Sequence, residues 1–177
     1  MWKSNRAIRT ALSCCLAALA VASSAGAGES DIAVVIKVKG TVRFCPPEND
    51  AWQAVSAGLV LAAGSRIRTE ADGLAMVKFL ADGSMMRLKP QTHLTLAARE
   101  AKKGVAVSLG SAFFDITKRR KGDDAFTVSS PTAVATVKGT AFWVTVDGDS
   151  VTVLACTQGV VRVKSLVSGK EQDVGAG

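Results

Sequence analysis

The chain of 177 residues contains no tyrosine, and its only histidine is His93. A metal site built on imidazole needs several ligands at close spacing, and no second histidine, cysteine pair or carboxylate cluster stands at such a spacing. A serine nucleophile needs a base within hydrogen-bond reach, and His93 is the only imidazole that could serve one. No glycine-rich loop precedes a helical pattern, so a phosphate-binding loop is not indicated. The sequence therefore predicts no catalysis, no metal and no cofactor.

Long apolar runs are equally scarce, and the one that occurs lies near the N-terminus. A basic stretch precedes an uncharged run from Ala11 to Ala22, and the small residues Ala25, Gly26 and Ala27 follow it. This order is typical of a secretory signal peptide over residues 1–27, cleaved after about Ala27, with a periplasmic or secreted product. A retained membrane anchor is the alternative, although the run is shorter than the ~20 residues that a spanning helix needs.

An excess of positive charge is present but modest. Of 22 basic and 15 acidic residues, removal of residues 1–27 takes away three basic ones, which lowers the net charge from +7 to +4. Export and this small excess argue against a nucleic-acid partner. One basic run, from Lys118 to Lys121, is interpreted as a solvated loop tip between strands. Contact with an anionic envelope surface is the functional alternative for this run.

Cysteine is also rare, and only Cys45 and Cys156 lie beyond the expected cleavage site. Two thiols outside the cytosol can pair, and both stand at the ends of expected strands. The sequence therefore favours a disulfide, which would stabilise the fold by roughly 4–5 kcal/mol by closing so long a loop. Two buried free thiols are the alternative.

Short alternating apolar segments fill the rest of the chain. Asp-Gly pairs at 72–73, 82–83 and 147–148 predict tight turns between them. Helical spacing is weak beyond the signal peptide, and only residues 97–103 fit one helical turn, with an exposed loop an equal alternative. The pattern predicts a single all-β domain over residues 28–177, built as a β-sandwich or a solenoid-like twisted sheet.

Four ordered motifs carry a resemblance to a known family. They lie in residues 58–69, 72–89, 109–116 and 126–144, and the chain there is similar to the FecR domain, the periplasmic part of the ferric-citrate sensor family. The residues that match the family pattern most closely are Gly64, Thr69, Asp82, Gly83, Gly110, Pro131, Gly139, Thr140 and Phe142. Two positions depart from it, because Ser65 stands where an aspartate is usual and Ser130 where a threonine is usual.

The resemblance implies an all-β fold and a role in protein contacts. The best-known members relay a signal from an outer-membrane transporter to a cytoplasmic sigma factor. No cytoplasmic domain precedes the apolar run here, so direct contact with a sigma factor is not expected. The leading hypothesis is a non-enzymatic module that binds an unidentified envelope protein, with edge strands as one means of doing so. The alternative is a carbohydrate or cell-wall binding module that uses Trp52 and Trp143 as stacking surfaces.

The tetrapeptide VKGT occurs at residues 38–41 and again at residues 137–140. The first copy is interpreted as a corner where any small turn residue would serve. The second lies inside the most family-specific motif, where Gly139 would permit a bulge or a close backbone approach. A Gly139→Val substitution is therefore expected to be far more damaging to folding than Gly40→Val.

Overall fold

The computed structural model describes residues 31–99, 102–118 and 125–177. The expected signal peptide and residues 119–121 of the basic run lie outside these ranges. Within them every regular element is a β-strand, and the same ranges contain no helix long and apolar enough to cross a membrane. The expectation of an all-β fold is confirmed.

Fifteen strands follow one another along the chain. Their bounds are β1 (Asp31–Lys39), β2 (Val42–Cys45), β3 (Gln53–Ala54), β4 (Val60–Ala62), β5 (Arg66–Thr69), β6 (Leu74–Phe79), β7 (Met85–Leu88), β8 (His93–Arg99), β9 (Lys102–Asp115), β10 (Phe126–Ser129), β11 (Ala133–Val137), β12 (Ala141–Val146), β13 (Thr152–Gln158), β14 (Val160–Ser165) and β15 (Glu171–Gly175).

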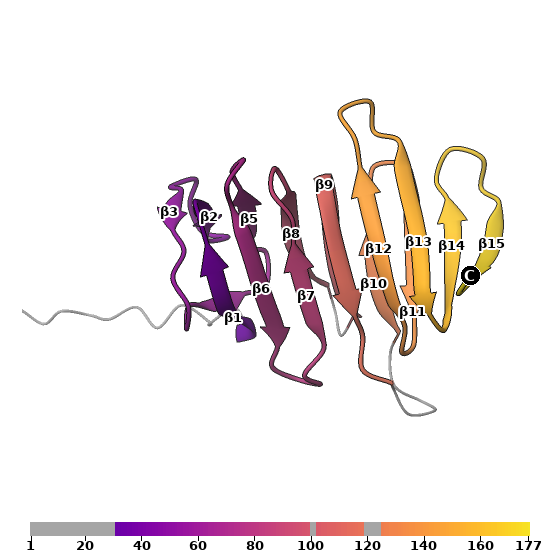
Figure 1. Ribbon diagram of the computed structural model, residues 1–177, viewed down its shortest axis with the longest axis horizontal. Helices are drawn as coiled ribbons and strands as arrows, with labels where there is room; N and C mark the ends of the chain where they lie inside the picture. Colours follow the sequence, from indigo (N-terminus) through magenta and orange to yellow (C-terminus); the bar gives the residue numbers. More distant parts are fainter. Residues whose placement is uncertain (1–30, 100–101, 119–124) are drawn as a thin grey trace, which may run out of the picture.

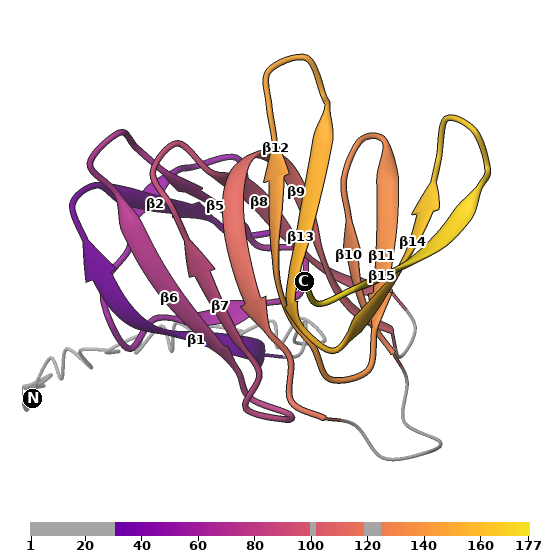
Figure 2. The ribbon, with the colours of Figure 1, turned by 45° about the vertical axis from the view of Figure 1, so that its right-hand side comes forward.

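The strands form two layers that face each other (Figures 1 and 2). Layer A has the order β4-β1-β6-β7-β9-β12-β13, and layer B has the order β3-β2-β5-β8-β9-β10-β11-β14-β15. The first part of β9 pairs with β8 and β10, and the part after Gly110 pairs with β7 and β12, so this strand joins the layers. Every pairing is antiparallel except that of β9 with β10. The chain crosses repeatedly between the layers, which gives a sandwich with solenoid-like winding.

The core lies between the layers, where alternate side chains of each strand point inward. Phe126 of layer B meets Phe79 and Phe114 of layer A, with ring centroids 5.1 and 6.3 Å apart. Phe114 stacks on Phe142 at 5.3 Å, and all four rings are buried. Burial of each such side chain contributes about 1.5–3 kcal/mol. These contacts hold the two layers face to face.

Buried threonines join neighbouring corners at one end of the sandwich. The Thr69 hydroxyl accepts a hydrogen bond from the Thr92 backbone N–H at 2.9 Å and donates to the Lys89 carbonyl at 2.6 Å. The Thr92 hydroxyl in turn accepts from the Ser111 N–H at 3.0 Å. Both threonines are at most 1% exposed. The two hydroxyls supply hydrogen-bond partners to backbone groups that lie between the end of one strand ladder and the start of the next.

An ion pair fastens the C-terminal hairpin of β14 and β15. Arg162 donates through Nε and Nη2 to the two carboxylate oxygens of Asp173, at 2.9 and 3.1 Å. These hydrogen bonds hold the pKa of Asp173 below its ordinary value. Lys164 lies 3.3 Å from Glu171, and these two residues pair two positions further along the same ladder.

The expected disulfide between Cys45 and Cys156 does not form, and both thiols are free. Cys45 ends β2 in layer B, whereas Cys156 lies in β13, the last strand of layer A. Each sulfur has local partners instead. The Cys45 thiol contacts the Asn49 carbonyl at 3.0 Å, and the Cys156 thiol contacts the Gly159 carbonyl at 3.4 Å. Similar positions at strand ends misled the sequence-based expectation, because β2 lies near one end of the sandwich and β13 towards the other (Figure 1).

Within residues 97–103, the described residues 97–99 and 102–103 lie in β-strands and form neither a helical turn nor a loop. β8 continues to Arg99 and β9 begins at Lys102, with Ala97 paired to Gly104. The pairing with a long neighbouring strand overrides the weak local helical tendency of this segment.

The two VKGT copies are more alike than the sequence suggested. Gly40 and Gly139 both have positive φ angles, +65° and +123°, which side-chain-bearing residues rarely adopt. A Cβ atom at Gly40 would overlap the carbonyl of Asp72, and one at Gly139 would lie 2.7 Å from the Cα atom of Lys118. The expectation that any small turn residue would serve at Gly40 is therefore wrong.

Gly40→Ala and Gly139→Ala should each lower the free energy of unfolding by at least about 2 kcal/mol, because each adds backbone strain to a steric overlap. Gly148→Ala is the matched control, since its added Cβ would meet nothing within 4 Å and its φ is not positive. This control should change stability by less than about 0.5 kcal/mol. Urea unfolding of the three variants measures the difference, and a Gly40→Ala variant as stable as the control would contradict the corner geometry.

The pKa of Asp173 should be measurably below that of an unperturbed aspartate when its carboxyl carbon is followed by NMR over an acid titration. The stabilisation from this group is complete above the pKa of the unfolded chain and is lost as pH falls through the lower, folded-state pKa. Arg162→Gln should raise the Asp173 pKa towards its ordinary value, because the first cause of the depression is the hydrogen bond from Arg162. An unchanged titration in this variant would contradict the ion pair.

Candidate functional site

The residues of the family pattern are spread over the framework and do not meet in one pocket. Asp82 accepts a hydrogen bond from the Ser84 N–H at 3.0 Å in the β6–β7 turn, and the Gly83 N–H donates to Phe79 in the same turn. Phe142 is fully buried. The others take turn, corner and strand-end positions: Gly64 between β4 and β5, Thr69 at the end of β5, Gly110 at the bend of β9, Pro131 between β10 and β11, and Gly139 with Thr140 between β11 and β12.

The acidic residues of the turns accept hydrogen bonds from backbone N–H groups, either of their own turn or of another corner. Asp72 accepts from the Thr41 N–H at 3.2 Å, and Asp147 accepts from the N–H groups of Asp149 and Val151 at 3.0 and 2.8 Å. Among residues 31–99, 102–118 and 125–177, no group of three or more His, Cys, Asp and Glu side chains is placed to hold a metal ion. The interpretation of these aspartates as turn residues accounts for their contacts.

On the outward face of layer B, Trp52 lies among arginine side chains. The Arg68 and Arg66 guanidinium carbons are 4.6 and 5.7 Å from the indole centroid. Arg66 also donates to the carboxylate of Asp50 at 2.5 Å and to the Cys45 sulfur at 3.0 Å. The hydrogen bond to Asp50, followed by that to Cys45, raises the pKa of Arg66.

All the ion pairs within the described residues belong to layer B or to the loops that leave its strands. They are Arg43–Glu70, Arg66–Asp50, Arg68–Glu70, Arg162–Asp173 and Lys164–Glu171. The basic side chains of this layer are thereby largely neutralised by neighbouring carboxylates.

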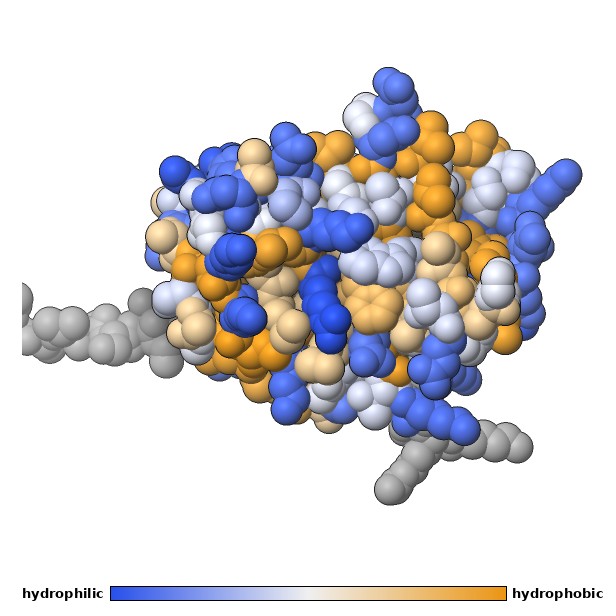
Figure 3. Space-filling view, viewed as in Figure 1, coloured by the Kyte–Doolittle hydropathy of each residue, from blue (hydrophilic) through white to orange (hydrophobic). Residues whose placement is uncertain are grey.

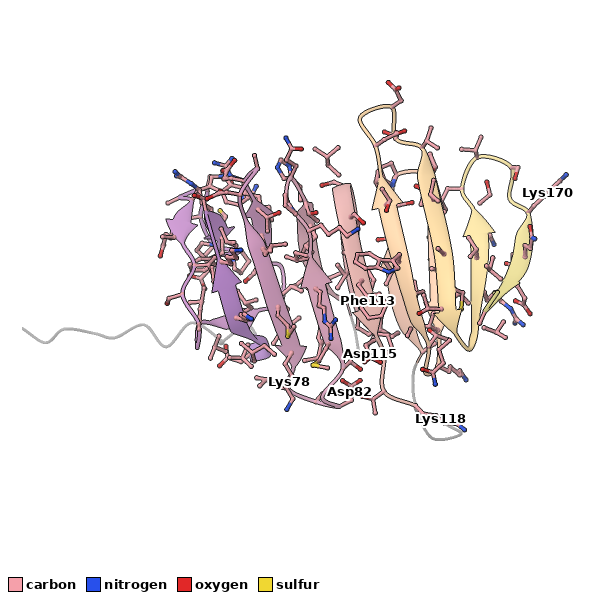
Figure 4. The ribbon with its side chains drawn as sticks, in the orientation of Figure 1. Lys78, Asp82, Phe113, Asp115, Lys118 and Lys170 are labelled. Carbon is pink, nitrogen blue, oxygen red and sulfur yellow. The ribbon has the colours of Figure 1, made fainter. Side chains whose placement is uncertain are left out.

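The outward face of layer A has a different character. Basic and apolar side chains alternate across its strands, and we call this set the basic–aromatic face: Lys37, Lys39, Leu74, Met76, Lys78, Met85, Arg87, Lys89, Phe113 and Trp143. Figure 3 shows hydrophilic and hydrophobic side chains interleaved on this side of the molecule, and Figure 4 places Phe113 near its middle. Asp115 follows Phe113 by two residues in β9, so its acidic side chain lies on the same side of the strand.

The pairing register of the strands places four residues of this face in one row across β6, β7, β9 and β12. Met76 pairs with Arg87, Arg87 with Phe113, and Phe113 with Trp143. The Phe113 and Trp143 rings lie 5.0 Å apart, and the Arg87 guanidinium lies 5.7 Å from the Phe113 centroid. The Lys89 ammonium is 4.2 Å from the Trp143 centroid. Cation–π contacts at partly exposed sites contribute about 0.5–1 kcal/mol each, so the row is held in place.

A groove of about 230 Å³ lies beside this row, over β1, β6 and β7. Leu74 and Met76 contribute apolar side chains to it, and Lys37, Lys39 and Arg87 are the basic residues of its lining. The groove thus combines apolar contact surface with positive charge.

Layer A has two edge strands, β4 and β13, and β13 is the one at the C-terminal end of the sandwich. Within the described residues β13 pairs with β12 alone. The Asp147 N–H donates to the Val151 carbonyl at 3.1 Å, and hydrogen-bonded positions alternate along an antiparallel ladder. Val153 and Ala155 therefore bond to β12, whereas Leu154 directs its backbone N–H and C=O away from β12.

A second groove, of about 630 Å³, runs along this edge towards β14 and β15. Leu154, Val163 and Val174 supply its apolar residues, and Lys170 and Glu171 are among its polar ones. β15 comes near β13 without pairing with it. The sandwich is consequently open at its C-terminal end.

Sequence reasoning identified the two tryptophans but not their surroundings. Trp143 does point away from Phe142 and Val144, as the alternation indicated, and it is half-buried. Its ring already contacts Lys89 and Phe113, and the Trp52 ring contacts two arginines. Both indole rings are therefore already in contact with other side chains, which limits the ring surface on which a sugar could stack. The alternation of basic and apolar residues in β6 and β7 was a readable signal for the basic–aromatic face, but the order of strands was not.

Comparisons with known proteins address the family of the chain. Two crystal structures of a candidate anti-sigma factor from Parabacteroides distasonis ATCC 8503 each align with a TM-score of 0.48 and 18% identity, over 63% of this chain and 59% of theirs. The chain thus spans less than two thirds of the length of these proteins. No curated protein matches it. The sequence model of the FecR protein family matches residues 65–162, more than half of the chain, and the chain therefore belongs to the FecR protein family.

Proposed function

We propose that this FecR-family chain is a non-catalytic, periplasmic or secreted module that binds a protein of the cell envelope and serves in signalling or assembly there. Membership of a regulatory family supports the general role. The observation that carries the proposal is the unpaired edge of β13 beside a groove with both apolar and polar residues in its lining. An exposed edge of this kind is a template for an added strand from a partner.

The sequence of β13 suits strand addition. Natural edge strands are commonly protected by lysine, proline or a bulge. No charged residue and no proline occurs from Val151 to Val161, and the bulge of β13 lies at Thr157, beyond its stretch from Thr152 to Cys156. Val151 and Val153 are 55% and 59% exposed. A partner strand beside Leu154 would bond to its free backbone groups and place alternate side chains in the groove. Together these features favour a protein partner held by backbone pairing.

A carbohydrate or cell-wall ligand is the second candidate, suggested by the exposed portions of Trp52 and Trp143. The cationic and aromatic groups that already contact both indoles weigh against it. Binding of purified peptidoglycan fragments, followed by a shift in tryptophan fluorescence, would favour this candidate.

A photo-crosslinking residue at Ala155 should capture a protein of defined mass in cells of the native host. Val153→Lys should reduce that product about tenfold, because a lysine on the edge strand opposes strand addition. Val160→Lys is the matched control, since Val160 is 55% exposed but lies in β14, which has a neighbour on each side. It should leave the product unchanged.

Thermal unfolding of both lysine variants establishes that each is folded before the crosslinks are compared. Equal loss of the product in Val153→Lys and Val160→Lys would remove the edge from the proposal. Failure of Ala155 to capture any protein, with glycan fragments bound by the same sample, would favour the carbohydrate candidate instead.

A further inference from the structure

The two outward faces of the sandwich differ in whether carboxylates form ion pairs with their basic side chains. Every ion pair within the described residues involves layer B or its loops. On layer A, none of Lys37, Lys39, Arg87 and Lys89 has a carboxylate of the described residues within 4 Å. Among the described residues, these four side chains therefore carry positive charge that no ion pair balances, and such a surface attracts a negatively charged partner.

The same face offers the side-chain types that dominate protein interfaces. Arginine, tryptophan, phenylalanine and methionine are enriched at such interfaces, and arginine and tryptophan carry much of their binding energy. Arg87, Phe113 and Trp143 already form a contiguous row, with Met76 paired to Arg87. Their mutual contacts restrict the side chains before binding, which lowers the entropy lost on association.

The groove beside this row indicates the size of the apolar group that it accepts. Its volume of about 230 Å³ is below the ~300–1,000 Å³ of sites for drug-sized ligands. Leu74 is 39% exposed at this groove, so apolar surface is available there. A single apolar side chain fits this space better than an extended acyl chain does.

A membrane surface fits the face less well than a protein does. Asp115 and the polar residues Ser111 and Thr145 share the outward side of layer A. Phe113 and Trp143 are half-buried against each other instead of standing clear of the surface. Binding at a bilayer interface depends on apolar side chains that enter the lipid together with attraction to anionic headgroups, and half-buried rings among polar residues meet the first of these requirements poorly.

We propose that the basic–aromatic face binds an acidic segment of a protein, with carboxylates of the segment against Lys37, Lys39 and Arg87 and one apolar side chain in the groove beside Leu74 and Met76. This inference deepens the proposed function and rests on it only in taking the partner to be a protein. The face reaches the edge of β13 at Trp143, which pairs with Ala155, but its groove lies over β1, β6 and β7, so variants of the groove test it separately from that edge.

The probe is a fluorescent synthetic peptide in which four glutamates flank one leucine, and its binding is followed by anisotropy at several salt concentrations. Lys37→Gln/Lys39→Gln should weaken binding about three- to tenfold and flatten the dependence of affinity on salt, because two charge contacts are lost. The matched control is Arg162→Gln/Lys164→Gln, which removes the same net charge from layer B and should leave the affinity unchanged.

A second variant tests the groove independently of charge. Leu74→Ser should weaken binding of the leucine peptide, but not of a peptide with alanine in place of leucine. Vesicles of phosphatidylglycerol, titrated in parallel, test the lipid surface. Equal effects of the two glutamine double variants, no saturable binding of the peptide, or binding of vesicles without binding of the peptide would each overturn the inference. The outcomes at Lys37, Lys39 and Leu74 concern β1 and β6, whereas the loss of the Ala155 crosslink in Val153→Lys reports on the edge of β13.

Discussion

The fold depends on satisfying the backbone wherever the chain passes from one layer to the other. At each crossing, N–H and C=O groups have left one ladder and have not yet entered the next, and burying them unpaired is unfavourable. Thr69 and Thr92 meet this requirement at three neighbouring corners by bonding to backbone groups of Lys89, Thr92 and Ser111. Turn aspartates such as Asp72 and Asp147 do the same at more exposed corners.

Once the backbone groups of the corners are hydrogen-bonded, the alternation of side chains along each strand determines which residues enter the core and which lie on the outward faces. Inward positions fill the core around Phe114, Phe126 and Phe142, which clamps the layers together. Outward positions are left free of packing constraints, and the two layers use that freedom differently. Layer B places carboxylates beside its arginines, whereas layer A places aromatic and methionine side chains beside its lysines and Arg87.

The residues that match the family pattern and the surfaces proposed to bind partners are therefore separate. The residues that carry the FecR pattern, such as Gly83, Gly139 and Phe142, shape turns, corners and the core. The basic–aromatic face and the edge of β13 lie on the scaffold that these residues build. A family defined by such framework positions can keep its fold while its outward residues adapt to different partners.

Several properties were readable from the sequence by itself. Alternating apolar residues and Asp-Gly turns specified an all-β fold, since both are local signals set by the period of a strand and the φ angles of a turn. The outward direction of Trp143 followed from the same period.

Only the tertiary structure decided which strands became neighbours. It separated Cys45 from Cys156, made Gly40 as constrained as Gly139 through the carbonyl of Asp72, and joined Arg87, Phe113 and Trp143 into one row. The physical reason is that strand order and register depend on contacts between residues far apart in the chain, which no local period encodes.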